Sequence, residues 1–305
     1  MAVIEARGLT KVFNGAAAVD ALDLAVEEGE VYGFLGPNGA GKTTTIKMLL
    51  GLTRPTKGSA KVNGTAVDMT SVAFRRDIGY LPERIAFYPN LTATQTLGFF
   101  AELKGADKKQ IPKLLKRVGL KEHAKKRLGA YSKGMRQLLG VAQALIGDPA
   151  LLVFDEPMEG LDPRWRREVK TIITEAHKAG STVFFSSHIL GEVEEVADRV
   201  GILNKGKFVA QDTVANLRSH LTVKSRLRIR LKDGAEAAGY VAAKVPGVAR
   251  WWHSGDEILV ECDPDAKAKV IAAVAASGKE VVDIRSEDPT LEEVFLELTD
   301  KGAAS

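Results

Sequence analysis

The chain has 305 residues, of which 45% are hydrophobic and 27% charged, so we expect one large or two ordinary soluble domains. No apolar run approaches the ~18 residues that cross a membrane, and the N-terminus lacks the basic start and apolar stretch of an export signal. The single cysteine, Cys262, excludes an intrachain disulfide and is expected on a buried strand, and a net charge of +4 is too mild to indicate a nucleic-acid partner.

A glycine-rich segment near the N-terminus carries a phosphate-binding pattern. Residues 36–43 read Gly-Pro-Asn-Gly-Ala-Gly-Lys-Thr and match G-x-x-x-x-G-K-[ST] at every position. The apolar run 30–35 predicts a buried strand before this loop, and residues 44–50 predict a helix after it. Such a loop presents backbone N–H groups and a positive helix end to phosphate oxygens. We therefore expect a nucleotide site in which Lys42 reaches the outer phosphates and the Thr43 hydroxyl binds Mg²⁺.

Strand-like and helix-like segments alternate from residue 1 to about residue 215, which indicates an α/β core with a largely parallel sheet. A helix-rich stretch interrupts this alternation, and we expect an inserted helical subdomain at about residues 88–145. Between Lys104 and Arg127 lie ten Lys or Arg residues and only two acids. A solvated helical face is the favoured interpretation, and the alternative is a surface that lies near anionic lipid head groups.

Two strands later in this core end in polar residues. The apolar residues 151–154 are followed by Asp155 and Glu156, and the strand predicted at 182–185 leads into a Ser-Ser-His run that ends at His188. Ligands of open α/β sheets bind at the carboxyl ends of the strands. We therefore expect Asp155 to hold Mg²⁺, Glu156 to polarise the water that attacks a γ-phosphate, and His188 to donate to the γ-phosphate oxygens.

The character of the sequence changes after residue 217. We expect a first domain at 1–218 and a small α+β domain at 220–305. The predicted order in the second domain is β-α-β-β-α-β, the split or ferredoxin-like arrangement, followed by one more helix. The segments behind this prediction are strands at 227–231, 248–252, 258–262 and 281–284 and helices at 235–243, 264–276 and 291–298.

Five motifs together resemble those of one family, the ATP-binding cassette (ABC) ATPases. Two are the phosphate loop and the strand that ends in Asp155 and Glu156. The third, Tyr-Ser-Lys-Gly-Met-Arg-Gln at 131–137, is similar to the LSGGQ signature, and the fourth, Gly-Leu-Asp-Pro at 160–163, matches the motif after the Walker B strand. The fifth is His188, which matches the switch histidine. The resemblance covers residues 1–215 and implies a P-loop NTPase cassette that hydrolyses ATP with Mg²⁺.

The resemblance also implies how the ATP site is completed. One cassette supplies the phosphate loop, the Mg²⁺ ligands and the base, and the signature helix of a second cassette closes over the γ-phosphate. A homodimer that sandwiches two ATP molecules is therefore implied, with Phe13 stacked on adenine and Asp162 facing the partner. The residues implied to bind nucleotide are Phe13, Val19, Asn38, Gly39, Ala40, Gly41, Lys42, Thr43, Thr44, Ser132, Lys133, Gly134 and Asp162.

Two positions depart from the family pattern. Glu83 stands where the lid motif normally has Gln, and we expect it among the metal-site residues with Thr43 and Asp155. Its extra charge is worth on the order of 4 kcal/mol at about 4 Å and an effective dielectric near 20, which could favour Mg²⁺ or repel the γ-phosphate. The second departure, Met158-Glu159 in place of Thr and a small polar residue, has no functional explanation in the sequence.

Several short runs resemble the ATPases of type-2 (ABC-2) exporters. They are Leu-Pro-Glu at 81–83, Phe-Tyr-Pro at 87–89, Leu-Lys-Gly at 103–105 and an acidic run at 288–295. The resemblance implies separate multi-span permease subunits and a peripheral location at the cytoplasmic face of the inner or plasma membrane. We expect the aromatic-rich surface around Phe87 and Tyr88 to receive a short permease helix.

Within these exporters, the chain is similar to the ATPase of the transporter that matures nitrous oxide reductase, a copper enzyme. That similarity implies a role in copper-enzyme maturation, with a periplasmic accessory protein as a further partner. A general drug or lipid exporter is the alternative. A soluble cassette protein that acts on ribosomes or DNA is disfavoured, because the chain has one phosphate loop and no heptad run.

Overall fold

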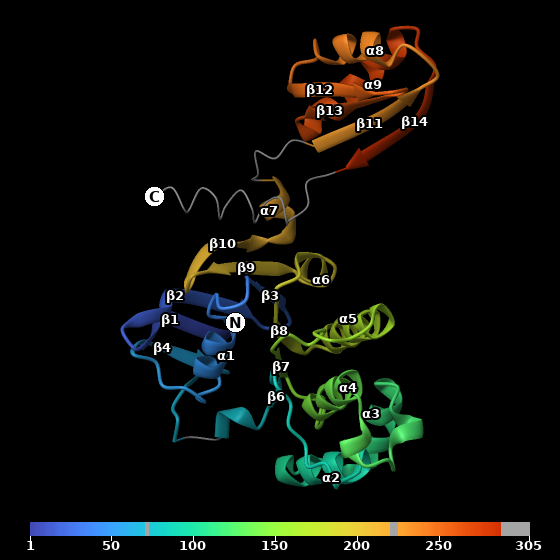
Figure 1. Cartoon of the computed structure of the whole chain (residues 1–305). Helices are drawn as coiled ribbons and strands as arrows, with labels where there is room; N and C mark the ends of the chain where they lie inside the picture. Colours follow the sequence, from blue (N-terminus) through green and yellow to red (C-terminus); the bar gives the residue numbers. More distant parts are fainter. Residues whose placement is uncertain (71–72, 220–224, 288–305) are drawn as a thin grey trace. The chain divides into compact units, whose positions relative to one another are not determined.

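The computed structural model describes residues 1–70, 73–219 and 225–287, and the chain divides into two compact units, 1–214 and 215–305 (Figure 1). The sequence places the domain boundary at 218–220, a few residues beyond this division. Among the described residues, no helix combines the length and the apolar character that crossing a bilayer requires.

A six-stranded sheet forms the centre of the first unit (Figure 1). Its neighbouring strands are parallel, except for the antiparallel pair β10 and β9 at one edge. Both β3 and β7 are buried along their whole length, which explains why each is an unbroken apolar run in the sequence. In spatial order the strands are β10 (Lys207–Thr213), β9 (Arg199–Asn204), β3 (Val31–Leu35), β8 (Thr182–Ser187), β7 (Leu151–Phe154) and β6 (Ile78–Leu81).

A second, antiparallel sheet belongs to the same unit, and the sequence pattern did not predict it as a separate sheet. A hydrophobic core joins this sheet to the central one and to α1, with fully buried side chains such as Ile4, Ile46 and Phe34. The elements are β2 (Ala16–Glu27), β1 (Ala2–Phe13), β4 (Lys57–Val62), β5 (Thr65–Ala66) and α1 (Lys42–Leu49).

The inserted helical subdomain lies between β6 and β7 in the chain, and its helices gather at one end of the unit (Figure 1). Thr92 caps α2 with a reciprocal capping box that it forms with Gln95. The expected α/β cassette with a helical insertion is thus confirmed. The helices of the unit beyond α1 are η1 (Ala73–Arg75), α2 (Ala93–Lys104), η2 (Lys108–Gln110), α3 (Ile111–Arg117), η3 (Lys121–His123), η4 (Leu128–Ala130), α4 (Lys133–Ala144), α5 (Pro163–Lys178) and α6 (Leu190–Glu194).

The second unit is a four-stranded antiparallel sheet with two helices, in the β-α-β-β-α-β order that the sequence predicts. Cys262 is fully buried in its core, as expected. The helix predicted at 291–298 lies outside the described residues. After α7 (Val214–Ser219), the elements are β11 (Ser225–Leu231), α8 (Ala235–Ala242), β12 (Val248–Ser254), β13 (Glu257–Cys262), η5 (Pro264–Ala266), α9 (Lys267–Ala276) and β14 (Val281–Glu287).

Candidate active site

The loop that follows β3 has the backbone shape of a phosphate cradle. Gly39 and Gly41 adopt the left-handed conformation, with φ angles of 82° and 109°. A Cβ atom on Gly41 would also lie 2.4 Å from the carbonyl oxygen of Ala18, so only glycine fits this position. Gly41 begins α1 without a side-chain cap, and the first N–H groups of the helix are therefore available to phosphate oxygens.

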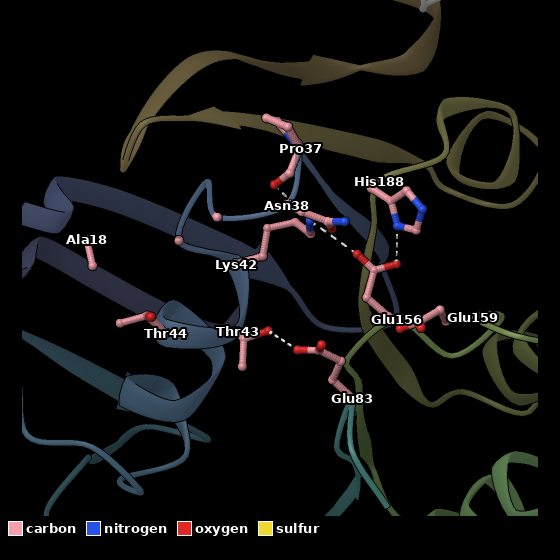
Figure 2. Close-up of a pocket in the computed structure, with 12 residues that line it drawn as sticks. Ala18, Pro37, Asn38, Lys42, Thr43, Thr44, Glu83, Glu156, Glu159 and His188 are labelled. Carbon is pink, nitrogen blue, oxygen red and sulfur yellow. Dashed lines mark hydrogen bonds and ion pairs between the residues drawn. The ribbon is translucent and has the colours of Figure 1, made fainter. Parts of the chain in front are cut away.

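Lys42 lies in the same cleft with a buried ammonium group (Figure 2). Its Nζ donates to the carbonyl oxygens of Gly36 at 2.6 Å and Pro37 at 3.3 Å, and lies 3.1 Å from Oε1 of Glu156. Because both charged groups of this ion pair are more than nine-tenths buried, water screens their attraction little. A triphosphate in the loop would be a strong competing acceptor for the same ammonium group.

Asp155 and Glu156 directly follow β7, and both are buried. Ser186, in the adjacent strand β8, donates to Oδ1 of Asp155 at 2.7 Å and accepts the Glu156 N–H at 2.9 Å. Burial raises the pKa of Asp155 above its ordinary value, and the charges of Glu83 and Glu156 act in the same direction, whereas the Ser186 and Thr43 hydroxyls lower it. The surroundings of Asp155 therefore favour its neutral, protonated form over the charged carboxylate.

Glu156 is held in an unusual backbone conformation, with a φ of 52° that non-glycine residues rarely adopt. The buried amide of Gln137 on α4 donates to the carbonyl oxygens of Glu156 and Pro157, at 3.2 Å each. His188 Nδ1 lies 2.9 Å from Glu156 Oε2, while Lys42 approaches the other carboxylate oxygen (Figure 2). The Glu156 carboxylate is thereby fixed between a cation and an imidazole.

The oxygen atoms that could hold a divalent cation gather around Thr43. Thr43 Oγ1 donates to Glu83 Oε2 at 3.1 Å, and Asp155 Oδ2 is buried with no hydrogen-bond partner among the described residues. Hydroxyl and carboxylate oxygens are the ligands that Mg²⁺ prefers, so the residues fit this ion. In the described parts of the chain, no three His, Cys, Asp or Glu side chains form a metal site of their own. Phosphate and water oxygens would complete the coordination shell, as is usual for Mg²⁺.

A cleft of about 460 Å³ brings most of the predicted site residues together (Figure 2). Three residues that the sequence analysis did not select, Ala18, Pro37 and Glu159, also line it. Pro37 belongs to the phosphate-loop pattern, whereas nothing in the sequence marks Ala18. The predicted residues that line the cleft are Asn38, Gly39, Gly41, Lys42, Thr43, Thr44, Glu83, Glu156 and His188.

Three predicted nucleotide contacts lie outside this lining. Val19 departs from the expectation, because its side chain is fully buried in the core while the preceding residue, Ala18, faces the cleft. Successive residues of a strand point to opposite faces of the sheet, so Ala18 faces the cleft when Val19 faces the core. Ala40 is buried beneath the loop. Phe13, on β1, is half exposed, and the Lys11 ammonium lies 4.9 Å from the centre of its ring.

The signature and Asp162 positions are also outside the cleft of their own chain. Ser132 caps α4 by accepting the Met135 N–H at 3.2 Å, and Asp162 caps α5 by accepting the Trp165 N–H at 3.1 Å. Lys133 of the signature motif forms an ion pair with Glu159, with 2.8 Å between Nζ and Oε1. Glu159 is one of the two residues at 158–159 that depart from the family pattern.

A phosphate cradle at the end of one parallel strand, with carboxylates at the end of another, defines a P-loop nucleoside triphosphatase. The similarities of the chain to known proteins are more specific. Residues 19–159 match the family described as ABC transporter.

Two relatives are similar over nearly the whole chain. The first is the bacitracin transport ATP-binding protein BcrA of Bacillus licheniformis, 36% identical over 304 residues that cover 98% of each chain. The second is the daunorubicin/doxorubicin resistance ATP-binding protein DrrA of Streptomyces peucetius, 37% identical over 97% of this chain and 92% of the relative.

The fold is also shared with a solved structure, the dimeric cassette MJ0796 in a post-hydrolysis state bound to ADP and Pi. The TM-score is 0.64 and the identity 23%, over 69% of this chain and 98% of that one. The chain thus belongs to the ABC transporter family. It is an ATP-binding subunit with ATPase activity, as the motifs indicate.

Proposed function

We propose that this ATPase powers a type-2 exporter as a homodimer bound to separate permease subunits. The observation that carries the proposal is the convergence of Lys42 and His188 on Glu156 in one cleft, in a chain that is similar to two ATP-binding proteins over nearly its whole length. Each part of the proposal has its own support and its own test.

The chemistry assigned to the cleft is the attack of water on the γ-phosphate of ATP. Lys42 and the loop N–H groups bind and orient the phosphates, since phosphoryl transfer depends mainly on positioning and on neutralising charge. Glu156 accepts the proton of the attacking water. His188 orients Glu156 and donates to the γ-phosphate oxygens. Mg²⁺, held by Thr43, Asp155 and Glu83, supplies further charge neutralisation when bound.

The homodimer is supported by what the single chain leaves incomplete. Ser132, Lys133 and Gly134 do not line the cleft that holds the phosphate loop, so a second copy is needed to bring a signature motif to each nucleotide. Glu156→Gln protein mixed with ATP should therefore form a dimer in light scattering, whereas ADP should leave a monomer. The further change Ser132→Arg should abolish the ATP-dependent dimer, and persistence of that dimer would contradict this arrangement.

The surface assigned to the permease is the aromatic face of the helical subdomain. Tyr88, Phe99 and Leu103 are 70%, 52% and 67% exposed, and Phe100 makes edge-to-face contacts with both Phe87 and Phe99. Such grouped exposed apolar side chains are typical of a protein–protein contact. The location that follows is peripheral, at the cytoplasmic face of the membrane.

For the cargo, we favour a drug-like or lipid-like compound, because bacitracin and daunorubicin appear in the names of the two relatives. The role in copper-enzyme maturation, with a periplasmic accessory protein, stays a prediction from resemblance. The test is affinity purification of the chain from detergent-solubilised native membranes, followed by mass spectrometry. A multi-span permease should co-purify. Recovery only with ribosomes or nucleic acid would contradict the transporter role, and an accompanying copper-enzyme assembly protein would favour maturation.

A further inference from the structure

A buried carboxylate outside the cleft lining contacts the segment that carries His188. Glu192, on α6, is only 6% exposed, which is uncommon for glutamate. Its Oε2 accepts a hydrogen bond from Ser187 Oγ at 2.8 Å. Burial of a charged group costs free energy unless that group is paired. A glutamate buried at this position therefore has a role other than keeping the protein soluble.

The Ser187 hydroxyl links Glu192 to both sides of His188. Ser187 directly precedes the histidine, and its Oγ also accepts the N–H of Ile189, the residue that follows, at 3.0 Å. The backbone on either side of His188 is therefore held by one hydroxyl group, which Glu192 orients. His188 Nδ1 in turn lies 2.9 Å from Glu156.

Arg166 ties the same carboxylate to a second catalytic segment. Its guanidinium Nη1 lies 3.6 Å from Glu192 Oε1, the oxygen that makes no hydrogen bond among the described residues. Its Nε donates to the carbonyl oxygen of Leu161 at 2.9 Å. Leu161 belongs to the loop that connects Glu156 to α5, so Arg166 bridges the Glu156 and His188 segments.

We propose that Arg166 and Glu192 are positioning residues for ATP hydrolysis. Through Leu161 on one side and Ser187 on the other, they fix the loop after β8 against the loop after β7. His188 is thereby kept at hydrogen-bonding distance from Glu156. Neither residue lines the nucleotide cleft, so they act on the turnover step rather than on ATP affinity.

The chain offers a control ion pair between the same two segments, although its glutamate is more exposed than Glu192. Lys170, one helical turn beyond Arg166 on α5, lies 2.8 Å from Glu195, three residues beyond Glu192. This ion pair also joins α5 to the C-terminal end of α6, but in the described parts of the chain neither side chain is hydrogen-bonded to the loops that carry His188 and Glu156. If the role of Arg166 and Glu192 were only to hold the two helices together, the two pairs would behave alike.

The experiment measures kcat and KM for ATP with the purified full chain and its variants Glu192→Gln, Arg166→Met, Glu195→Gln and Lys170→Met. Glu192→Gln and Arg166→Met should each lower kcat by about tenfold or more, because small misplacements of catalytic groups are costly, with KM within about twofold. The two control variants should keep kcat within about twofold. Arg166→Lys should recover part of the lost turnover, since it keeps the positive charge.

Ser187→Ala provides a second route to the same link. It removes the hydroxyl while leaving Glu192 in place, and it should lower kcat as Glu192→Gln does, with the double variant no worse than either single one. Equal kcat losses in the Glu192 and Glu195 variants, or a rise in KM at constant kcat, would overturn the proposal. If Glu192→Gln fails to fold, a normal kcat in Ser187→Ala and Arg166→Met would overturn it as well. The result does not depend on the permease or the cargo.

Discussion

His188 Nδ1 lies 2.9 Å from Glu156 Oε2, and this contact joins the ends of the adjacent parallel strands β7 and β8. The opposite oxygen of the same carboxylate lies 3.1 Å from Lys42, which follows β3 on the other side of β8. Three segments far apart in the chain therefore meet at one carboxylate. In the mechanism proposed above, this one carboxylate holds Lys42 and accepts the proton of the attacking water.

The first prediction concerns this carboxylate. Glu156→Gln should lower kcat by about a hundredfold or more, because the variant lacks the proton acceptor. ATP affinity should stay equal or rise, since Lys42 loses a competing anion and becomes free for phosphate. Single-turnover hydrolysis and binding of a fluorescent ATP analogue measure the two effects separately. A parallel loss of affinity and turnover would show that Glu156 mainly supports the shape of the cleft.

The second prediction concerns Glu83, which is hydrogen-bonded to Thr43. Glu83→Gln should stay folded but need about three to ten times more Mg²⁺ for half-maximal turnover, because one anionic charge beside the cation is lost and water screens part of its effect. A Mg²⁺ titration of the ATPase rate is the measurement, with the melting temperature in EDTA as the control for folding. Superimposable titrations of the two proteins would refute a metal-site role for Glu83.

The third prediction concerns Asp155, whose pKa is raised mainly by burial. Asp155→Asn should abolish turnover yet raise the melting temperature of the Mg²⁺-free first unit at neutral pH by about 2–4 °C, since a charge that is disfavoured by burial is removed.

The pH dependence of this stabilisation follows from the direction of the shift. Folding favours the protonated form of Asp155, so the charge destabilises the wild type only as the pH rises from the ordinary pKa of 3.8 through the raised value, and fully above it. The gain from Asp155→Asn should therefore be largest at neutral pH and vanish on acidification. Thermal melts in EDTA across this range test the point, and a variant less stable than the wild type at pH 7 would contradict it.

The fourth prediction concerns the proposed permease contact. Tyr88→Glu should abolish co-purification with the permease while the ATPase rate of the isolated chain stays within about twofold, because Tyr88 is exposed and does not line the cleft. Tyr240→Glu is the matched control, since Tyr240 is a comparably exposed aromatic, at 59%, in the second unit. If the permease still co-purifies normally with Tyr88→Glu, this surface is not the permease contact.

Local sequence patterns were enough to predict much of the fold and much of the candidate site. The phosphate loop, Glu156 after β7 and His188 after β8 were expected at one site, and the structure brings them into one cleft, because parallel strands present their carboxyl ends at one edge of the sheet. The split order of the second unit followed from its alternating apolar segments and turns. These features depend on spacing along the chain, and spacing is visible in a sequence.

Only the tertiary structure decided which side chains face the cleft and which support it. Whether Ala18 or Val19 faces the cleft depends on which face of β2 meets the core. The second sheet depends on pairing between β1 and β4, which are more than forty residues apart in the chain. The bridge from Arg166 through Glu192 to Ser187 likewise joins α5, α6 and the end of β8. Such contacts arise from long-range packing, and no local pattern encodes them. The sequence by itself therefore determined the chemistry of the site, and folding decided how that chemistry is held in place.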